Sequence, residues 1–160
     1  MSGTIPFRIV PIGAEVASRA RREHRSPQYG HPATVELATG YGPCRQCLRT
    51  FRVGEEARLL FTYDPVPHGR GLPQPGPIFI HEAACAAFAG DGVPADLRGL
   101  PLFLEGFGRG TWQVRRQPAD AGSIEADIAA MLRDRTIELL QIRNAEAGCF
   151  IARVEWNRGS

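Results

Sequence analysis

The sequence predicts a single α+β domain with a mainly antiparallel sheet and two or three flanking helices. Short segments of alternating apolar residues, bounded by Gly or Pro, recur along the chain, as is typical of strands. The helical patterns do not alternate regularly with these strands, so a parallel βαβ architecture is not expected. With 160 residues, 43% of them hydrophobic, the chain is long enough to bury its own core. We expect one domain over residues 1–160, with its core at about 5–157.

The first half of the chain alternates short strands with irregular segments. The pattern predicts, in order, an edge strand at 5–11, a helix at 14–24, strands at 34–38, 57–63 and 78–80, and a helix of small residues at 82–89. Pro6 favours an edge position because proline cannot donate a hydrogen bond inside a ladder. Residues 64–77 contain five prolines and three glycines and are predicted to be a loop. A loop of this length inside a compact domain is often functional.

The second half of the chain is predicted to form two hairpins around one helix. The predicted elements are a helical turn at 95–98, strands at 101–107 and 111–116, a helix at 123–134, and strands at 136–143 and 149–156. Residues 106–110 are rich in glycine but lack the spacing of a dinucleotide fingerprint, and no helix follows them, so we interpret them as a hairpin turn. In the last strand, alternation places Phe150, Ala152, Val154 and Trp156 on one face.

Charge and hydropathy narrow the functional class. The net charge is +2, and all 19 basic residues are arginine, so no overall field favours nucleic acid or an anionic membrane. The basic residues at 19–25 are interpreted as a solvated helix end, and a nucleic-acid accessory protein is the weakest hypothesis. No apolar stretch is long enough for a membrane helix and no secretion signal is recognisable, so we expect a soluble cytoplasmic protein.

Two short motifs with metal-ligand spacing carry the strongest chemical signal. Cys44-x2-Cys47 lets two thiolates approach one ion from a turn, and His81-x3-Cys85 offers two more ligands. Together they predict a structural zinc ion bound by Cys3His, with the metal joining the two flanks of the 64–77 loop. Two alternatives remain open: buried, inert thiols beside an ordinary histidine, and a redox pair formed by Cys44 and Cys47.

A second group of residues predicts a site for a small anionic ligand. The candidate binding residues are Arg45, Asn144 and Arg153. Guanidinium groups there would bind a carboxylate or phosphate in bidentate fashion, although ordinary surface ion pairs are an alternative interpretation. A nucleophilic Cys149 or Cys44 would need a base, and His81 is the candidate.

Several stretches resemble an uncharacterised bacterial family, number 1203 among the domains of unknown function. They are Gly42-Pro43-Cys44-Arg45, Gly54-Glu55, Gly76-Pro77-Ile78-Phe79-Ile80-His81 and Asn144-Ala145 with Gly148-Cys149-Phe150. The resemblance implies a small, stand-alone bacterial protein and supplies no activity. Members often carry His-Val-His where this chain has Gln141-Ile142-Arg143, so a histidine-based role is not implied there. Some members also lack a cysteine at the place of Cys47.

The sequence therefore predicts a binding or accessory protein with a structural zinc site. The alternative hypothesis is a thiol-dependent enzyme that acts on a small anionic substrate.

Overall fold

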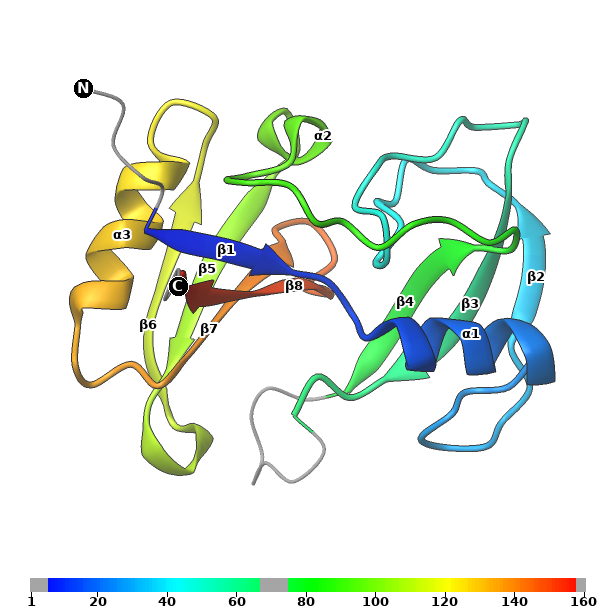
Figure 1. Cartoon of the computed structure of the whole chain (residues 1–160), viewed down its shortest axis with the longest axis horizontal. Helices are drawn as coiled ribbons and strands as arrows, with labels where there is room; N and C mark the ends of the chain where they lie inside the picture. The colour runs from blue at the N-terminus through cyan, green and yellow to red at the C-terminus, as the bar shows by residue number, and fades with distance from the viewer. Residues whose placement is uncertain (1–5, 67–74, 158–160) are drawn as a thin grey trace.

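Two antiparallel sheets form the computed structural model of this protein, which describes residues 6–66 and 75–157 (Figure 1). The five-stranded sheet has the order β1-β8-β7-β5-β6, and the three-stranded sheet has the order β2-β3-β4. The strands are β1 (Phe7–Val10), β2 (Thr34–Leu37), β3 (Ala57–Tyr63), β4 (Gly76–His81), β5 (Leu102–Phe107), β6 (Gln113–Ala119), β7 (Leu139–Asn144) and β8 (Phe150–Trp156). The helices are α1 (Ala14–Glu23), α2 (Ala95–Arg98), α3 (Ile124–Arg133) and the 3-10 turn η1 (Arg109–Thr111). The prediction of an α+β fold with antiparallel sheets is confirmed.

The five-stranded sheet buries one face against α3. Leu104 and Ile142 of the sheet and Ile128 and Met131 of the helix belong to one apolar cluster and have almost no exposed surface. The apolar stripe of α3 repeats at helical spacing, so one side of the helix covers the sheet while its polar side faces solvent.

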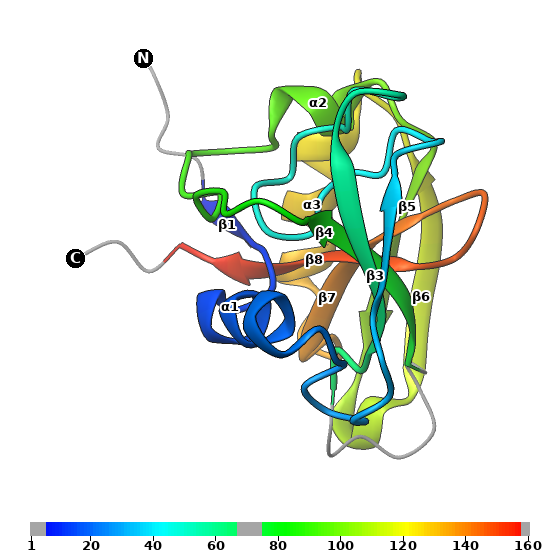
Figure 2. The same ribbon diagram turned by 90° about the vertical axis from the view of Figure 1, so that its right-hand side faces the viewer.

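The helix α1 lies beside the three-stranded sheet (Figure 2). The sheet and the helix share a separate apolar cluster. Ala17 and Ala20 are fully buried, and their small side chains let the helix approach closely. Leu59, Phe61 and Ile80 supply the sheet side of this cluster. Leu59 and Phe61 alternate along β3, as the period of two in the sequence predicts.

A bulge in β8 links the two clusters. Arg143 pairs with Phe150 and Ile142 pairs with Ala152, so Ile151 is an extra residue. Phe150 therefore packs in the cluster of the small sheet, whereas Ala152 packs beneath α3. The predicted common face for Phe150 and Ala152 was wrong, because one inserted residue reverses the alternation.

The segment predicted as a helix at 82–89 is irregular instead. The Glu82 N–H donates to the carbonyl of Ala57, and the Phe88 N–H donates to the carbonyl of Gln46. An isolated helix of eight residues is marginal even when rich in alanine, so hydrogen bonds to other segments prevail over local propensity.

The loop after β3 is shorter than predicted, because β4 already begins at Gly76. Pro77 is tolerated in this strand because β4 is an edge of its sheet. The rest of the predicted loop includes residues 67–74, which lie outside the described part of the chain. Within the described residues, no helix is long and apolar enough to span a membrane.

Candidate metal centre

Cys44 and Cys47 lie in a tight turn that is fastened to β4. The Arg45 N–H donates to the carbonyl of Phe79 at 2.9 Å, and the Leu48 N–H donates to the carbonyl of Cys44 at 2.9 Å. Leu48 closes the turn with a φ of 60°, a left-handed conformation that is uncommon for a non-glycine residue. The turn therefore sits beside the strand that ends at His81.

His81 and Cys85 reach the same place from the other side. His81 is the last residue of β4, and the irregular segment after it passes the turn, where Phe88 is hydrogen-bonded to Gln46. The His81 N–H also donates to Cys44 Sγ at 3.3 Å. Two motifs that are distant in the sequence thus meet between β4 and the turn.

Two separations within the group of four side chains match the edges of a tetrahedral metal site. Their ligand atoms all lie within 4.8 Å of one another, and the group could hold a metal ion. Cys44 Sγ and Cys85 Sγ are 3.8 Å apart, and Cys47 Sγ is 3.5 Å from His81 Nδ1. A tetrahedron with Zn–S near 2.3 Å and Zn–N near 2.0 Å has S–S edges of about 3.8 Å and S–N edges of about 3.5 Å. The same sulfur separation is far longer than the roughly 2.05 Å of a disulfide, and all four cysteines of the chain are free thiols.

Burial shields the cluster from water. Cys44 has no exposed surface, Cys47 and His81 are each 7% exposed, and Cys85 is partly buried. Four protein ligands complete a tetrahedron and leave no position for water or substrate, which is the arrangement of structural sites.

The three thiols strongly influence one another's ionisation. Hydrogen bonds from Cys44 and Cys85 lower the pKa of the Cys47 thiol. The corresponding hydrogen bonds raise the pKa of the Cys85 thiol, and the contact with Cys47 raises that of Cys44. One thiolate is thus stabilised at the expense of the other two, and a bound cation would be needed to keep all three ionised.

Charged side chains around the cluster suit a bound cation with thiolate ligands. Glu56 Oε2 lies 3.1 Å from His81 Nε2, as in the carboxylate–histidine–metal arrangement that orients a ligating imidazole. The Arg21 Nη2 donates to Cys85 Sγ at 3.3 Å, and the Arg21 Nε donates to the carbonyl of His81 at 2.9 Å. Sequence reasoning missed Glu56 and assigned Arg21 to a solvated helix end, because no motif spacing connects either residue to the cluster.

Two of the three predicted anion-binding residues are engaged with the main chain. The buried Arg45 donates from Nε to the Phe150 carbonyl at 2.6 Å and from Nη1 to the Pro43 carbonyl at 2.5 Å. Burial lowers the pKa of Arg45 to about 10. Asn144 Oδ1 accepts from the N–H groups of Glu146 and Ala147, at 2.8 and 3.1 Å, and so closes the turn between β7 and β8.

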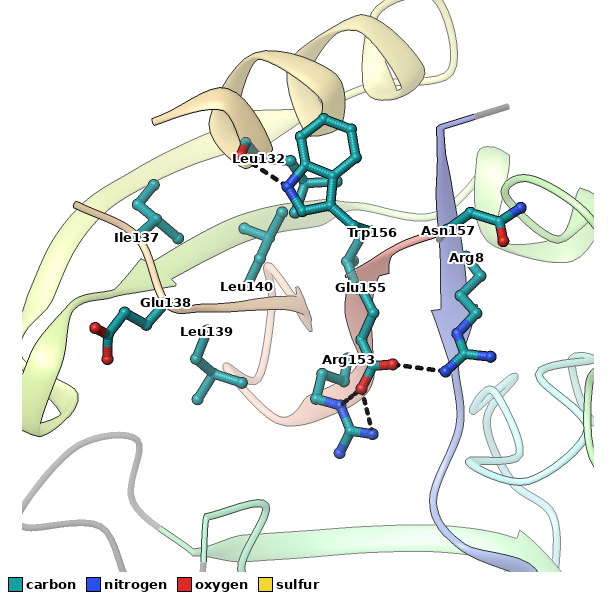
Figure 3. A pocket seen from close by; sticks show the side chains of 11 residues that line it. Arg8, Leu132, Ile137, Glu138, Leu139, Leu140, Arg153, Glu155, Trp156 and Asn157 are labelled. Atoms are coloured by element: carbon teal, nitrogen blue, oxygen red, sulfur yellow. Dashed lines mark hydrogen bonds and ion pairs between the residues drawn. The ribbon is translucent and has the colours of Figure 1, made fainter. Parts of the chain in front are cut away.

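Arg153, the third, lies apart from them on β8, where it lines a cavity of about 590 Å³ (Figure 3). Its Nη2 is 2.6 Å from Glu155 Oε2, and Glu155 Oε1 in turn is 2.9 Å from Arg8 Nη2. The Trp156 Nε1 donates to the carbonyl of Leu132 at 3.1 Å on the opposite side. Arg45 and Asn144 do not line this cavity, so the predicted set is not gathered at one place.

The candidate nucleophiles are also separated. Cys44 belongs to the buried cluster, whereas Cys149 precedes β8 and lines a different cavity, of about 360 Å³. The two ring nitrogens of His81 face Cys47 and Glu56. His81 is therefore placed to act as a ligand of the cluster.

The fold and the site together define the class: an α+β protein with a buried Cys3His cluster that could hold a metal ion. The model of one protein family, described as "Protein of unknown function (DUF1203)", matches residues 41–156, which is more than half of the chain and includes all four cluster residues. The chain belongs to this family, as the resemblance in its sequence predicts. No curated protein and no solved structure matches the chain.

Proposed function

We propose that this protein is a binding or accessory protein whose fold is held together by one structural zinc ion. Cys44, Cys47 and Cys85 would bind the ion through Sγ, and His81 through Nδ1. The observation that carries the proposal is the agreement of the 3.8 Å S–S and 3.5 Å S–N separations with the edges of a zinc tetrahedron.

The donor set favours zinc over the other common ions. Three soft thiolates and one imidazole in a tetrahedral arrangement suit Zn²⁺, whereas Mg²⁺ and Ca²⁺ prefer oxygen ligands and higher coordination numbers. A closed site has no position for substrate, so the ion would serve the fold. It would join the Cys44 turn, the end of β4 and the segment that carries Cys85, which also pack in one apolar cluster.

The direct test is the metal content of protein purified without added metal or chelator. We expect about one zinc ion per chain, and loss of the ion in Cys44→Ser, because a serine hydroxyl is a poor zinc ligand. Cys149→Ser is the matched control, because it removes the one cysteine that lies outside the cluster. Replacing the metal with Co²⁺ should give the absorption bands of tetrahedral thiolate coordination in the wild type and in Cys149→Ser.

Two results would contradict the proposal. One is protein that contains no metal and does not take up Zn²⁺ or Co²⁺ when reduced. The other is a zinc content that survives Cys44→Ser but falls in Cys149→Ser, which would place the ion elsewhere.

The contact between Glu56 and His81 predicts that loss of the carboxylate weakens zinc binding without abolishing it. Substituting Glu56→Gln is expected to weaken zinc binding by about 10–100-fold, because the carboxylate no longer orients the imidazole or raises its basicity. Competition with a chromogenic chelator measures this affinity. Glu55→Gln makes the same chemical change at an exposed neighbouring residue and should leave the affinity unchanged. Equal affinities for wild type and Glu56→Gln would show that the contact does not support the ligand.

A further inference from the structure

The cavity of about 360 Å³ that Cys149 lines is on the face of the five-stranded sheet opposite to α3. Phe103 of β5 and Phe150 of β8 contribute apolar surface, and Pro77 of β4 closes it from the small sheet. Cys149 also lines it. This volume falls within the range of about 300–1,000 Å³ that small-molecule sites occupy.

The polar groups of this cavity carry an excess of positive charge. Arg116, Arg143 and Glu105 line it, which gives two positive charges and one negative charge, or a net charge of +1. Sheet order brings them together: Arg116 of β6 pairs with Glu105 of β5, and β5 lies between β6 and β7, the strand of Arg143. Among the described residues, Arg116 forms no ion pair with a carboxylate.

Arg143 is only partly satisfied by the protein. Its side chain is 9% exposed. Its Nη1 donates to the Gly148 carbonyl at 2.8 Å, and its Nη2 donates to Gln141 Oε1 at 3.2 Å. Its Nε is 2.9 Å from Glu105 Oε1, but the Nε–H is not directed at that oxygen and has no hydrogen-bond partner among the described residues. Glu105 also accepts a hydrogen bond from Gln113, so its carboxylate is already shared. A buried guanidinium donor without a partner is costly unless a further acceptor reaches it.

Arg116 is oriented by an aromatic ring. Its guanidinium carbon lies 3.9 Å from the centroid of the Phe103 ring, a cation–π contact at the wall of the cavity. Burial is the main cause that lowers the pKa of Arg143, and the positive charge of the nearby Arg116 lowers it further. Two neighbouring guanidinium groups opposed by one carboxylate favour an anion between them.

We propose that this cavity binds a small organic carboxylate, with its carboxylate group at Arg116 and Arg143 and its apolar part against Phe103 and Phe150. A monoanion suits the net charge of +1, and the aromatic walls favour a ligand that carries hydrocarbon. The site is distinct from the zinc cluster and uses none of its ligands.

Cys149 makes the proposal testable without knowledge of the natural ligand. Iodoacetate is a small carboxylate that alkylates thiolates, and iodoacetamide is its neutral counterpart. The Cys149 sulfur attacks the methylene carbon, iodide leaves with the electrons of the C–I bond, and the thiol proton passes to the buffer. Mass spectrometry of the peptide 144–153 follows this cysteine alone, because it is the only one in that peptide.

We expect the ratio of the iodoacetate rate to the iodoacetamide rate to be at least fivefold higher at Cys149 than for glutathione in the same buffer. The iodoacetate rate should also saturate with concentration, and benzoate should protect Cys149 from iodoacetamide. The ratio should fall at least threefold in Arg116→Gln. Arg115→Gln is the matched control, because it removes the same charge from the adjacent exposed residue, which does not line the cavity.

A ratio equal to that of glutathione in the wild type would overturn the proposal. So would an equal loss in Arg115→Gln and Arg116→Gln, because the effect would then come from general surface charge. Both arginines are exposed, and thermal melting of each variant verifies that it is folded.

Discussion

Removal of the proposed zinc ion is expected to lower the melting temperature of this protein by roughly 8–16 °C. A ligand that binds only the folded state, at a free concentration about 1,000 times its dissociation constant, contributes about 4 kcal/mol to stability. In a domain of this size, each kcal/mol changes the melting temperature by about 2–4 °C. Thermal melting of the reduced protein, before and after removal of zinc with a chelator, measures the shift.

The destabilisation should be uneven across the fold. The cluster ties the Cys44 turn to β4, whereas α3 and the five-stranded sheet have a separate apolar cluster. Hydrogen exchange in the metal-free protein is therefore expected to increase most in 42–49, β3 and β4, and least in β5, β7 and α3. Cys44→Ser should melt at the temperature of the metal-free wild type and should not respond to chelator. An unchanged melting temperature in protein shown to be free of metal would contradict a structural role.

Gly42→Ala is expected to destabilise the protein by about 2–4 kcal/mol, which is a large loss for the addition of one methyl group. Gly42 has a φ of 89°, a conformation that residues with a Cβ rarely adopt. An added Cβ would also lie 2.5 Å from Cδ2 of the buried Phe51 ring. That ring packs against His81, with centroids 4.7 Å apart, so its displacement would disturb a residue of the Cys3His cluster.

Gly54→Ala separates the cost of the backbone conformation from the cost of the clash with Phe51. Gly54 also has a positive φ, of 78°, but nothing lies within 4 Å of the position of its Cβ. We expect it to lose only about 1 kcal/mol, from the backbone conformation alone. Urea unfolding of both variants, saturated with zinc, gives the comparison. If the two lose the same free energy of unfolding, the contact with Phe51 does not constrain this turn.

Local sequence patterns identified most of the strands and the helices α1 and α3, because their apolar residues repeat with clear periods of two or 3.6. The prediction failed at 82–89, where hydrogen bonds to Ala57 and Gln46 prevail over the helix propensity of alanine. It also failed at the bulge in β8, because one extra residue leaves no mark in a pattern of apolar residues.

The sequence by itself determined which residues could form a metal site. The two-residue spacing of Cys44 and Cys47 is a local property, since a tight turn places both sulfurs on one side. His81 and Cys85 were recognised by their own short spacing, with three residues between them. That the two pairs meet was decided by the tertiary structure, through the hydrogen bond from Arg45 to Phe79 and the contact of Phe88 with Gln46. Glu56 joined the site in the same way.

The tertiary structure alone decided which residues line the cavity that we propose as a carboxylate site. Arg116 and Arg143 lie on strands that are not neighbours, and they line one cavity because β6 and β7 both pair with β5. Long-range strand pairing depends on packing across the whole core, and no spacing in the sequence encodes it. The same packing placed Arg45 and Asn144 against main-chain groups. It placed Arg153 in a different cavity, which neither of those two residues lines. A site could therefore be predicted from the sequence where its residues are close along the chain. Which distant residues share a site became known only from the tertiary structure.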